Sequence, residues 1–182
     1  MPVGHATQRR VDAESGQSVR IGTLLRLSVK PLRKRKLDVF FIACFAFGVF
    51  SCLFSDLYAV MGWLEGEGFW AQANRYYLEG DPFLASHPYY MRIVMLTSAF
   101  VWLPFYLVFI YALVRGCNWV RPLALLYVGG ITVNMVNFFW FEFAGPLPPT
   151  EHLAWVLGWN LPYLIVPLLF GLRMWRHEPF GA

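Results

Sequence analysis

The sequence predicts an all-α membrane protein, a bundle of four transmembrane helices with a lumenal loop between the first and second helices. Composition is the first observation behind this fold class. Of the 182 residues, 58% are hydrophobic and only 14% are charged, and the mean hydropathy is +0.48. A soluble globular domain has about a quarter charged residues, so this chain has too few charges to cover a water-exposed surface. Long apolar segments and an uneven distribution of basic residues are the other two observations.

The apolar segments are long enough to cross a bilayer. They comprise residues 39–64, 93–114, 122–141 and 153–172. A hydrocarbon core about 30 Å thick needs about 20 residues of helix, and each segment meets that length. A soluble four-helix core would instead require polar helix faces, which these segments lack. We therefore expect four membrane spans.

The region before the first segment is polar and strongly basic. Nine of the 15 Lys and Arg residues precede Asp38. We expect residues 1–37 to form a disordered cytosolic tail, followed by a transmembrane domain at 38–175 and a short cytosolic tail at 176–182. A basic region beside a membrane span indicates orientation and contact with anionic membrane lipids, and we do not expect nucleic-acid binding.

The remaining basic residues indicate how the bundle is oriented. The loop between the first two segments, at 65–90, carries only Arg75, and Arg92 lies at its boundary. The other flanks carry Arg115 and Arg121 in the second loop and Arg173 and Arg176 near the C-terminus. Because Lys and Arg accumulate on the cytosolic side, both termini are expected in the cytosol and the first and third loops in the lumen or outside.

The lumenal loop at 65–90 is rich in aromatic and turn-forming residues. These aromatic residues suit a belt at the membrane interface, and they also suit a lid packed over the bundle. Inside the second and fourth segments, Pro104, Pro162 and Pro167 each remove a backbone hydrogen bond and are expected to bend the helices. Such bends would open space within the bundle.

Cysteine spacing and short motifs argue against a metal or cofactor. Cys44, Cys52 and Cys117 are odd in number and lie in or beside apolar runs, with no neighbouring cluster of Cys and His. We expect buried thiols here, with no disulfide and no metal site. Phosphate-binding glycine loops and soluble hydrolase motifs are also missing from the sequence, so we expect no cofactor.

Polar side chains within the segments gather in the half nearer the lumen. With a rise of about 1.5 Å per residue, Asp56 lies roughly 26 Å from the cytosolic start of the first segment. By the same estimate, the others lie about 6 to 15 Å below the lumenal side. They are Thr97, Ser98, Asn134, Asn137, Asn160 and Tyr163. One such residue alone commonly bonds between helices, but a shared depth on four helices predicts a polar pocket.

Aromatic residues at similar depth are expected to form the apolar walls of this pocket. They are Trp102, Phe105, Phe138, Phe139 and Trp155. The acidic group of Asp56 suits a ligand that carries an amine, or a carbocation formed during a reaction. It equally suits the donation of a proton to a bound lipid.

Several short motifs occur in a characteristic order. They are DLYAV at 56–60, DP at 81–82, LPF at 103–105, GCNWVR at 116–121 and PYLIVP at 162–167. Across about residues 38–175, their order and spacing resemble the EXPERA-domain family, which includes emopamil-binding protein and the sigma-two receptor. The resemblance implies a four-helix protein of the endoplasmic reticulum, often a homodimer, that binds sterol-like molecules or hydrophobic amines.

The resemblance also implies roles for individual residues. Asp56, Asp81 and Tyr163 match ligand-site positions, and Asn160 matches an asparagine of the isomerase branch. Two positions depart from the family. Ser98 stands at the place of a ligand-contacting glutamate of the receptor type, and Cys52 stands at the place of a histidine of the isomerase branch. These departures put in question both amine binding and two-acid catalysis of the family kind.

Three functions remain open from the sequence. The leading hypothesis is binding of a sterol-like or other isoprenoid lipid, and the second is an acid–base isomerase or cyclase acting on such a lipid, with Asp56 and Asp81 as the catalytic residues. The third is a structural or trafficking partner without a small ligand. The predicted ligand-binding residues are Asp56, Asp81, Ser98, Trp102, Asn134, Asn137, Asn160 and Tyr163.

Overall fold

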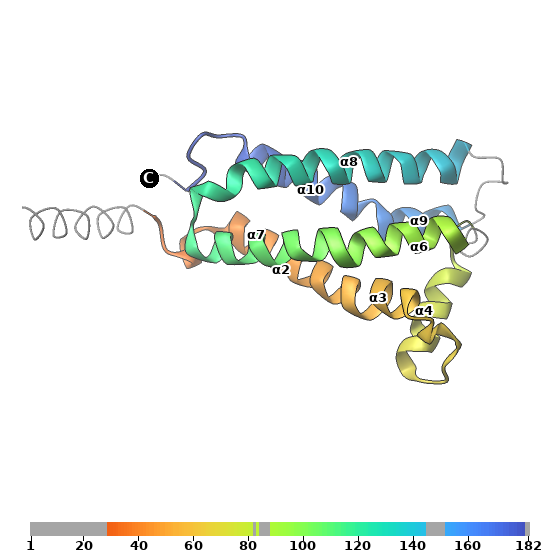
Figure 1. Cartoon of the computed structure of the whole chain (residues 1–182). Coiled ribbons are helices and arrows are strands. Elements are labelled where there is room, and N and C mark those ends of the chain that lie inside the picture. The colour runs from red at the N-terminus through yellow and green to blue at the C-terminus, as the bar shows by residue number, and fades with distance from the viewer. Residues whose placement is uncertain (1–28, 82, 84–87, 145–151, 181–182) are drawn as a thin grey trace, which may run out of the picture.

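The computed structural model describes residues 29–81, 83, 88–144 and 152–180, and this part of the chain consists of helices and turns without a strand. Most of the predicted amino-terminal tail and the third loop lie outside these ranges. Within them, four helices are long and apolar enough to cross a membrane: Lys36–Val60, Arg92–Arg115, Asn118–Ala144 and Leu153–Met174. They confirm the four predicted spans, which we number 1 to 4 in chain order (Figure 1).

Span 1 ends earlier than the predicted boundary at residue 64. Its last helical residue is Val60, and Gly62 follows in a left-handed conformation with φ of 75°. Glycine adopts this conformation without steric cost, and a residue in the left-handed conformation ends a right-handed helix. Gly116, with φ of 69°, ends span 2 in the same way.

Spans 1 and 2 each contain one wide π-helical turn. Span 1 consists of α2 (Lys36–Ser51), a π turn (Cys52–Asp56) and α3 (Leu57–Val60). Span 2 consists of the last part of α6, which begins at Pro88 and ends at Thr97, a π turn (Ser98–Trp102) and α7 (Leu103–Arg115). In span 2, Pro104 has no N–H to donate to the carbonyl of Phe100, which favours the wider turn. The two π turns pack against each other.

Span 3 consists of a 3-10 turn (Asn118–Val120) and the uninterrupted helix α8 (Arg121–Ala144). Span 4 is divided into α9 (Leu153–Asn160) and α10 (Pro162–Met174). The break follows from Pro162, which cannot donate to the carbonyl of Gly158. Asn160 is thereby the last residue of α9.

The segment between spans 1 and 2, read from the sequence as a loop, contains an 11-residue helix, α4 (Phe69–Glu79). It begins after Gly68 and ends at Gly80, two residues that favour helix ends. Figure 1 shows α4 at the end of the bundle opposite the start of α2 and the end of α10. We call this the α4 end.

The four spans form two pairs that share an aromatic core. α2 packs mainly against α7, and α10 packs mainly against α8. One ring from each span meets at the centre: the ring of Phe45 lies 5.3 Å from that of Phe109 and 4.9 Å from that of Phe170, and Phe109 lies 5.1 Å from Tyr127. Each such ring pair adds about 0.5–1.5 kcal/mol beyond the burial of its area.

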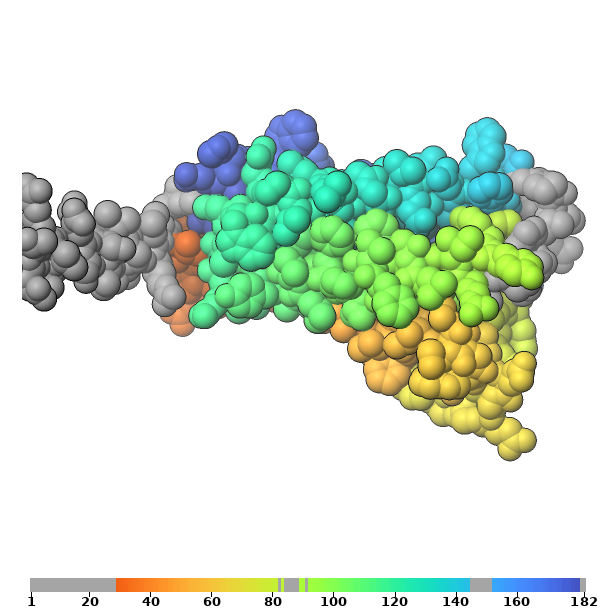
Figure 2. All heavy atoms as spheres, viewed as in Figure 1, coloured from red at the N-terminus to blue at the C-terminus, as the bar shows by residue number. Residues whose placement is uncertain are grey.

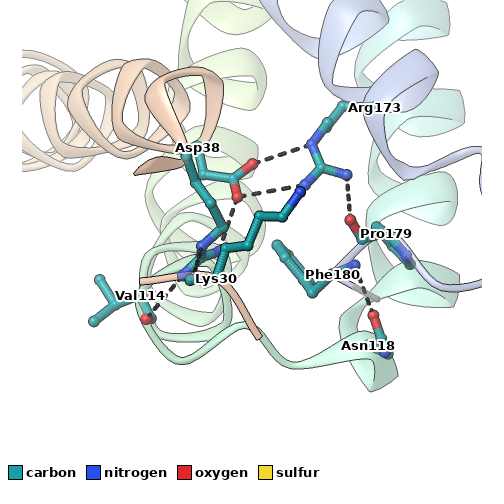
Figure 3. Close-up of polar contacts among 8 residues, drawn as sticks. Lys30, Asp38, Val114, Asn118, Arg173, Pro179 and Phe180 are labelled. Atoms are coloured by element: carbon teal, nitrogen blue, oxygen red, sulfur yellow. Dashed lines mark hydrogen bonds and ion pairs between the residues drawn. The ribbon is translucent and has the colours of Figure 1, made fainter. Parts of the chain in front are cut away.

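At the end of the bundle opposite α4, a polar cluster joins spans 1 and 4 (Figure 3). The Asp38 carboxylate, only 1% exposed, accepts hydrogen bonds from Arg35 at 2.8 Å and from Nε of Arg173 at 3.1 Å. The Phe180 ring lies 5.4 and 5.3 Å from the two guanidinium carbons, and its N–H donates to Asn118. We call Arg35, Asp38, Arg173 and Phe180 the clasp. The predicted C-terminal tail is therefore packed against the bundle as far as Phe180.

Toward the α4 end, spans 1 and 4 diverge. Near the clasp, the Phe41 and Phe45 rings of span 1 meet the Phe170 ring of span 4. Figures 1 and 2 show α3 and α4, in orange and yellow, projecting away from α8 and α9, so that the molecule is broader at this end. The divergence leaves room for a cavity in the half of the bundle that the sequence assigns to the lumenal side.

Candidate functional site

A cavity of about 420 Å³ lies among all four spans and α4. This volume falls within the range of about 300–1,000 Å³ that is typical of small-molecule sites. Aromatic and aliphatic side chains form most of its wall. They are Phe47, Phe50, Phe54, Trp70, Ala73, Tyr76, Tyr77, Val94, Met95, Trp102, Tyr106, Ile131, Met135, Phe138, Trp155, Trp159 and Tyr163. The other lining residues are Ser51, Ser55, Asp56, Asn74, Ser98, Asn134 and Asn160.

The structure brings most of the predicted site residues to this cavity. Asp56, Ser98, Trp102, Asn134, Asn160 and Tyr163 are all among its lining residues. Asn137 and Asp81 are not. Asn137 is exposed, because Asn134 already lies at the edge of the face formed by the buried Ile131, Met135 and Phe138, and a step of three residues turns Asn137 about 60° further from that face. Asp81 is fully buried just beyond the end of α4.

Three of the five aromatic residues expected in the walls lie at this cavity. Trp102, Phe138 and Trp155 line the cavity, whereas Phe105 and Phe139 lie outside its lining. Phe105 packs instead against Tyr127 and Phe109 in the aromatic core. Similar depth along a helix therefore does not ensure that two rings share a surface.

The two π turns position the acidic group. Asp56 ends the first π turn and Ser98 begins the second, so both face the same space. The thiol of Cys52, which is a free cysteine, lies 3.2 Å from the Ser98 hydroxyl and 3.5 Å from its carbonyl oxygen. Cys52 and Ser98 both lie within hydrogen-bonding reach of the Asp56 carboxyl. Cys52 and Ser98, the two positions that depart from the family pattern, thus contact each other beside Asp56.

Helix α4 supplies a wall of the cavity that the sequence analysis missed. Its residue Asn74 is buried and accepts a hydrogen bond from the Ser55 hydroxyl at 2.7 Å. The same amide donates to the carbonyls of Phe54 at 3.0 Å and Trp70 at 2.8 Å. These bonds fix α4 to the π turn of span 1. The signal in the sequence is the spacing of Trp70, Asn74 and Tyr77, which places them on one helical face.

Tyr77 connects α4 to span 4. Its carbonyl accepts a hydrogen bond from Nε1 of Trp155 at 3.3 Å, and its ring meets the Trp159 ring edge-on at 5.9 Å. Asn160 lies within hydrogen-bonding reach of its hydroxyl. Burial, followed by the nearby carboxyl groups of Asp81 and Asp56, raises the pKa of Tyr77 well above its ordinary value. The hydroxyl therefore keeps its proton at neutral pH and is a hydrogen-bond donor.

The cavity carries little charge. Among the lining residues that the structure describes, Asp56 provides the one carboxyl group, and there is no Lys, Arg or His. The described part of the chain also has no group of three His, Cys, Asp or Glu side chains that could hold a metal ion. The arrangement can enclose an apolar body and offer neutral donors, neutral acceptors and one acid to a polar group on it.

Several side chains of spans 1 and 4 border both the cavity and the outer surface. Phe47, Phe50 and Phe54 of span 1 and Trp159 of span 4 line the cavity and are also exposed on the surface of the bundle. In a bilayer, this surface faces hydrocarbon. An apolar ligand in the cavity would thus remain next to lipid on one side.

One family model matches the sequence of this chain. The family model described as EXPERA (EXPanded EBP superfamily) matches residues 69–174. The match runs from α4 to the end of α10 and includes the cavity walls formed by α4 and by spans 2 to 4. Span 1 with Asp56 lies before the matched range. Because the match covers more than half of the 182 residues, this chain belongs to the EXPERA family.

Proposed function

We propose that this protein binds a sterol-like or other isoprenoid lipid in the cavity between its spans. The observation that carries the proposal is the combination of an apolar cavity of about 420 Å³ with a single lining carboxyl group, within a four-span membrane protein of the EXPERA family. Sites for small hydrophobic molecules have this composition, a mainly apolar wall with a few polar groups that orient the ligand.

The charge of the lining supports a neutral or cationic lipid. A fatty acid or a phospholipid headgroup carries a negative charge that would need a basic partner once it leaves water. The described lining residues offer no such partner, and Asp56 would repel an anion if it is ionised. A lipid with a small neutral polar group and a large apolar body matches the lining best.

An acid–base isomerase or cyclase is the second candidate, and one observation favours it. Asp56 lines the cavity beside Ser98 and Cys52, where it can give a proton to a double bond of a bound lipid and, as the carboxylate, then take a proton from a neighbouring carbon, so that the double bond shifts. The other predicted acid, Asp81, is not among the lining residues. Chemistry that needs one proton donor agrees with this arrangement better than chemistry that needs two acids. We rank lipid binding above catalysis.

We place the bundle in the membrane of the endoplasmic reticulum with both chain ends in the cytosol. Val29 lies beside Gly116 and the N–H of Phe180 donates to Asn118, so the first and last described residues lie at the end that also carries Arg35, Arg115, Arg121 and Arg176. The α4 end carries Arg75 and Arg92. This asymmetry supports the orientation, and the family resemblance supports the organelle. The homodimer implied by the resemblance stays a prediction.

Binding can be tested with the purified full-length protein in phosphatidylcholine nanodiscs. Dehydroergosterol is a fluorescent sterol that accepts energy from tryptophan, and Trp70, Trp102 and Trp155 line the cavity. We expect saturable energy transfer that cholesterol reverses and palmitate does not. Absence of saturation, or equal displacement by palmitate, would contradict the proposal.

The same preparation distinguishes a binding protein from an enzyme. Each sterol is recovered after prolonged incubation and analysed by chromatography for a shifted double bond. A binding protein returns the sterol unchanged. Appearance of an isomer that Asp56→Asn abolishes, with sterol binding retained, would establish the second candidate.

A further inference from the structure

Helix α4 brings a tyrosine hydroxyl into the cavity, and four contacts fix the position of this helix. Asn74 holds α4 to span 1, with Ser55 donating at 2.7 Å and the Phe54 carbonyl accepting at 3.0 Å. On the other side, the Tyr77 carbonyl accepts from Trp155 at 3.3 Å, and the Tyr77 ring packs edge-on against Trp159. A side chain held on both sides in this way presents its hydroxyl at a fixed place.

Polar groups from spans 1 and 4 lie near the Tyr77 hydroxyl there. Asn160 of α9 is within hydrogen-bonding reach of it, and Asp56 and Tyr163 are close enough to act on it electrostatically. All four side chains line the cavity. They come from α4, span 1 and both halves of span 4. The polar groups of the lining therefore converge, whereas residues such as Phe50, Trp102 and Phe138 surround the remaining space with apolar surface.

The kinds of polar group at this point define what they can recognise. The Tyr77 hydroxyl keeps its proton and donates, and the carboxyl of Asp56 has an oxygen that accepts in either protonation state. An alcohol both accepts and donates, so it satisfies the two groups together. A ketone or an ether only accepts, and a hydrocarbon does neither. A buried donor or acceptor left without a partner costs free energy.

We propose that Tyr77 is a ligand-binding residue that donates a hydrogen bond to a hydroxyl group on the lipid, while an oxygen of Asp56 accepts from the same hydroxyl. The inference rests on the proposed function and narrows it to lipid alcohols. It assigns a specificity-determining role to α4, which supplies the donor.

The test combines one protein substitution with one ligand substitution. Tyr77→Phe removes only the hydroxyl and keeps the ring against Trp159 and the carbonyl that Trp155 uses. Tyr89→Phe is the matched control, because Tyr89 is 85% exposed and lies outside the cavity lining. Cholesterol and cholest-5-ene, which lacks the hydroxyl, are measured in nanodiscs as competitors of dehydroergosterol.

We expect Tyr77→Phe to weaken cholesterol binding about 3- to 10-fold, the range of a single hydrogen bond. Binding of cholest-5-ene should be the same in Tyr77→Phe, Tyr89→Phe and the unmodified protein. Equal affinity of Tyr77→Phe and unmodified protein for cholesterol would overturn the inference and leave the proposed function standing. An equal loss for both sterols would show a structural role for Tyr77 and would also overturn it. If neither sterol binds the unmodified protein, the inference and the proposed function both fail.

Discussion

Asn134 and Asn137 show at the residue scale why depth and surroundings must be separated. Both lie on α8 at nearly the same depth, and both were predicted to bind ligand. Asn134 lines the cavity, whereas Asn137 is exposed on the outer face of the helix. Sequence spacing gives the rise along a helix accurately, but a helix must be placed against its neighbours before the direction of a side chain is known.

This pair provides a matched test on one helix. Asn134→Leu replaces an amide in the cavity with an apolar group of similar size, and we expect sterol affinity to fall about 5- to 10-fold through loss of hydrogen bonding. Asn137→Leu makes the same chemical change outside the cavity and should leave the affinity unchanged. Dehydroergosterol titrations of both variants provide the comparison. A larger loss from Asn137→Leu than from Asn134→Leu would place the ligand elsewhere.

Asp56 and Ser98 were predicted correctly to share a depth, and the structure adds the reason that they meet. Each lies in a π-helical turn, and these two turns pack side by side. Pro104 could suggest an irregular turn in span 2, but span 1 has no proline that would indicate its own. Local sequence therefore predicted the residue types and their depth, and tertiary packing decided the backbone that presents them.

At the element scale, α4 is the feature that the sequence analysis described incompletely. Its aromatic residues were interpreted as an interfacial belt or a lid, without a helix or a role for Asn74. The helical spacing of Trp70, Asn74 and Tyr77 was available in the sequence. A short helix bounded by Gly68 and Gly80 is difficult to separate from a turn-rich loop, because its stability comes from contacts with spans 1 and 4.

The contact between α4 and span 4 depends on a glycine. A Cβ atom added at Gly80 would lie 2.2 Å from Nε1 of Trp155, so Gly80→Ala must displace the indole from its bond to the Tyr77 carbonyl. We expect faster amide hydrogen exchange in α4 and about tenfold weaker sterol binding. Mass spectrometry of peptides from residues 69–81 measures the exchange.

Gly68→Ala is the control for this prediction, since a Cβ at Gly68 meets nothing within 4 Å. Both variants add one methyl group at an end of the same helix. If the exchange of α4 is equal in the two variants, the seating of Trp155 against Gly80 does not hold α4 in place.

At the scale of the whole molecule, the clasp and α4 close opposite ends of a bundle whose spans 1 and 4 diverge. The clasp joins the two spans through Asp38 and Arg173 (Figure 3). At the other end, α4 joins them through Asn74 and Tyr77. The cavity occupies the space between these connections. The number and length of the spans were predictable from hydropathy, but the clasp was not, because it joins residues 135 positions apart.

The clasp should contribute to stability without contacting the ligand. Asp38→Asn removes the charge that faces two guanidinium groups, and loss of one partner from a buried ion pair typically costs about 3–5 kcal/mol. We expect a lower unfolding temperature in detergent and unchanged sterol affinity at low temperature. Arg176→Gln, at an exposed residue near the same end, should have little effect on either. An unfolding temperature of Asp38→Asn equal to that of the unmodified protein would refute the stabilising role of the clasp.

The central claim, that a lipid alcohol occupies the cavity between the spans, is tested most directly by photo-crosslinking. A sterol with a photoreactive diazirine on its ring system is added to the full-length protein in nanodiscs, irradiated and located by peptide mass spectrometry. We expect labelling of α4, of the two π turns and of α9 around Asn160, suppressed by excess cholesterol. Labelling confined to lipid-facing residues outside the cavity, such as Leu126 and Leu172, and unaffected by cholesterol, would contradict the claim.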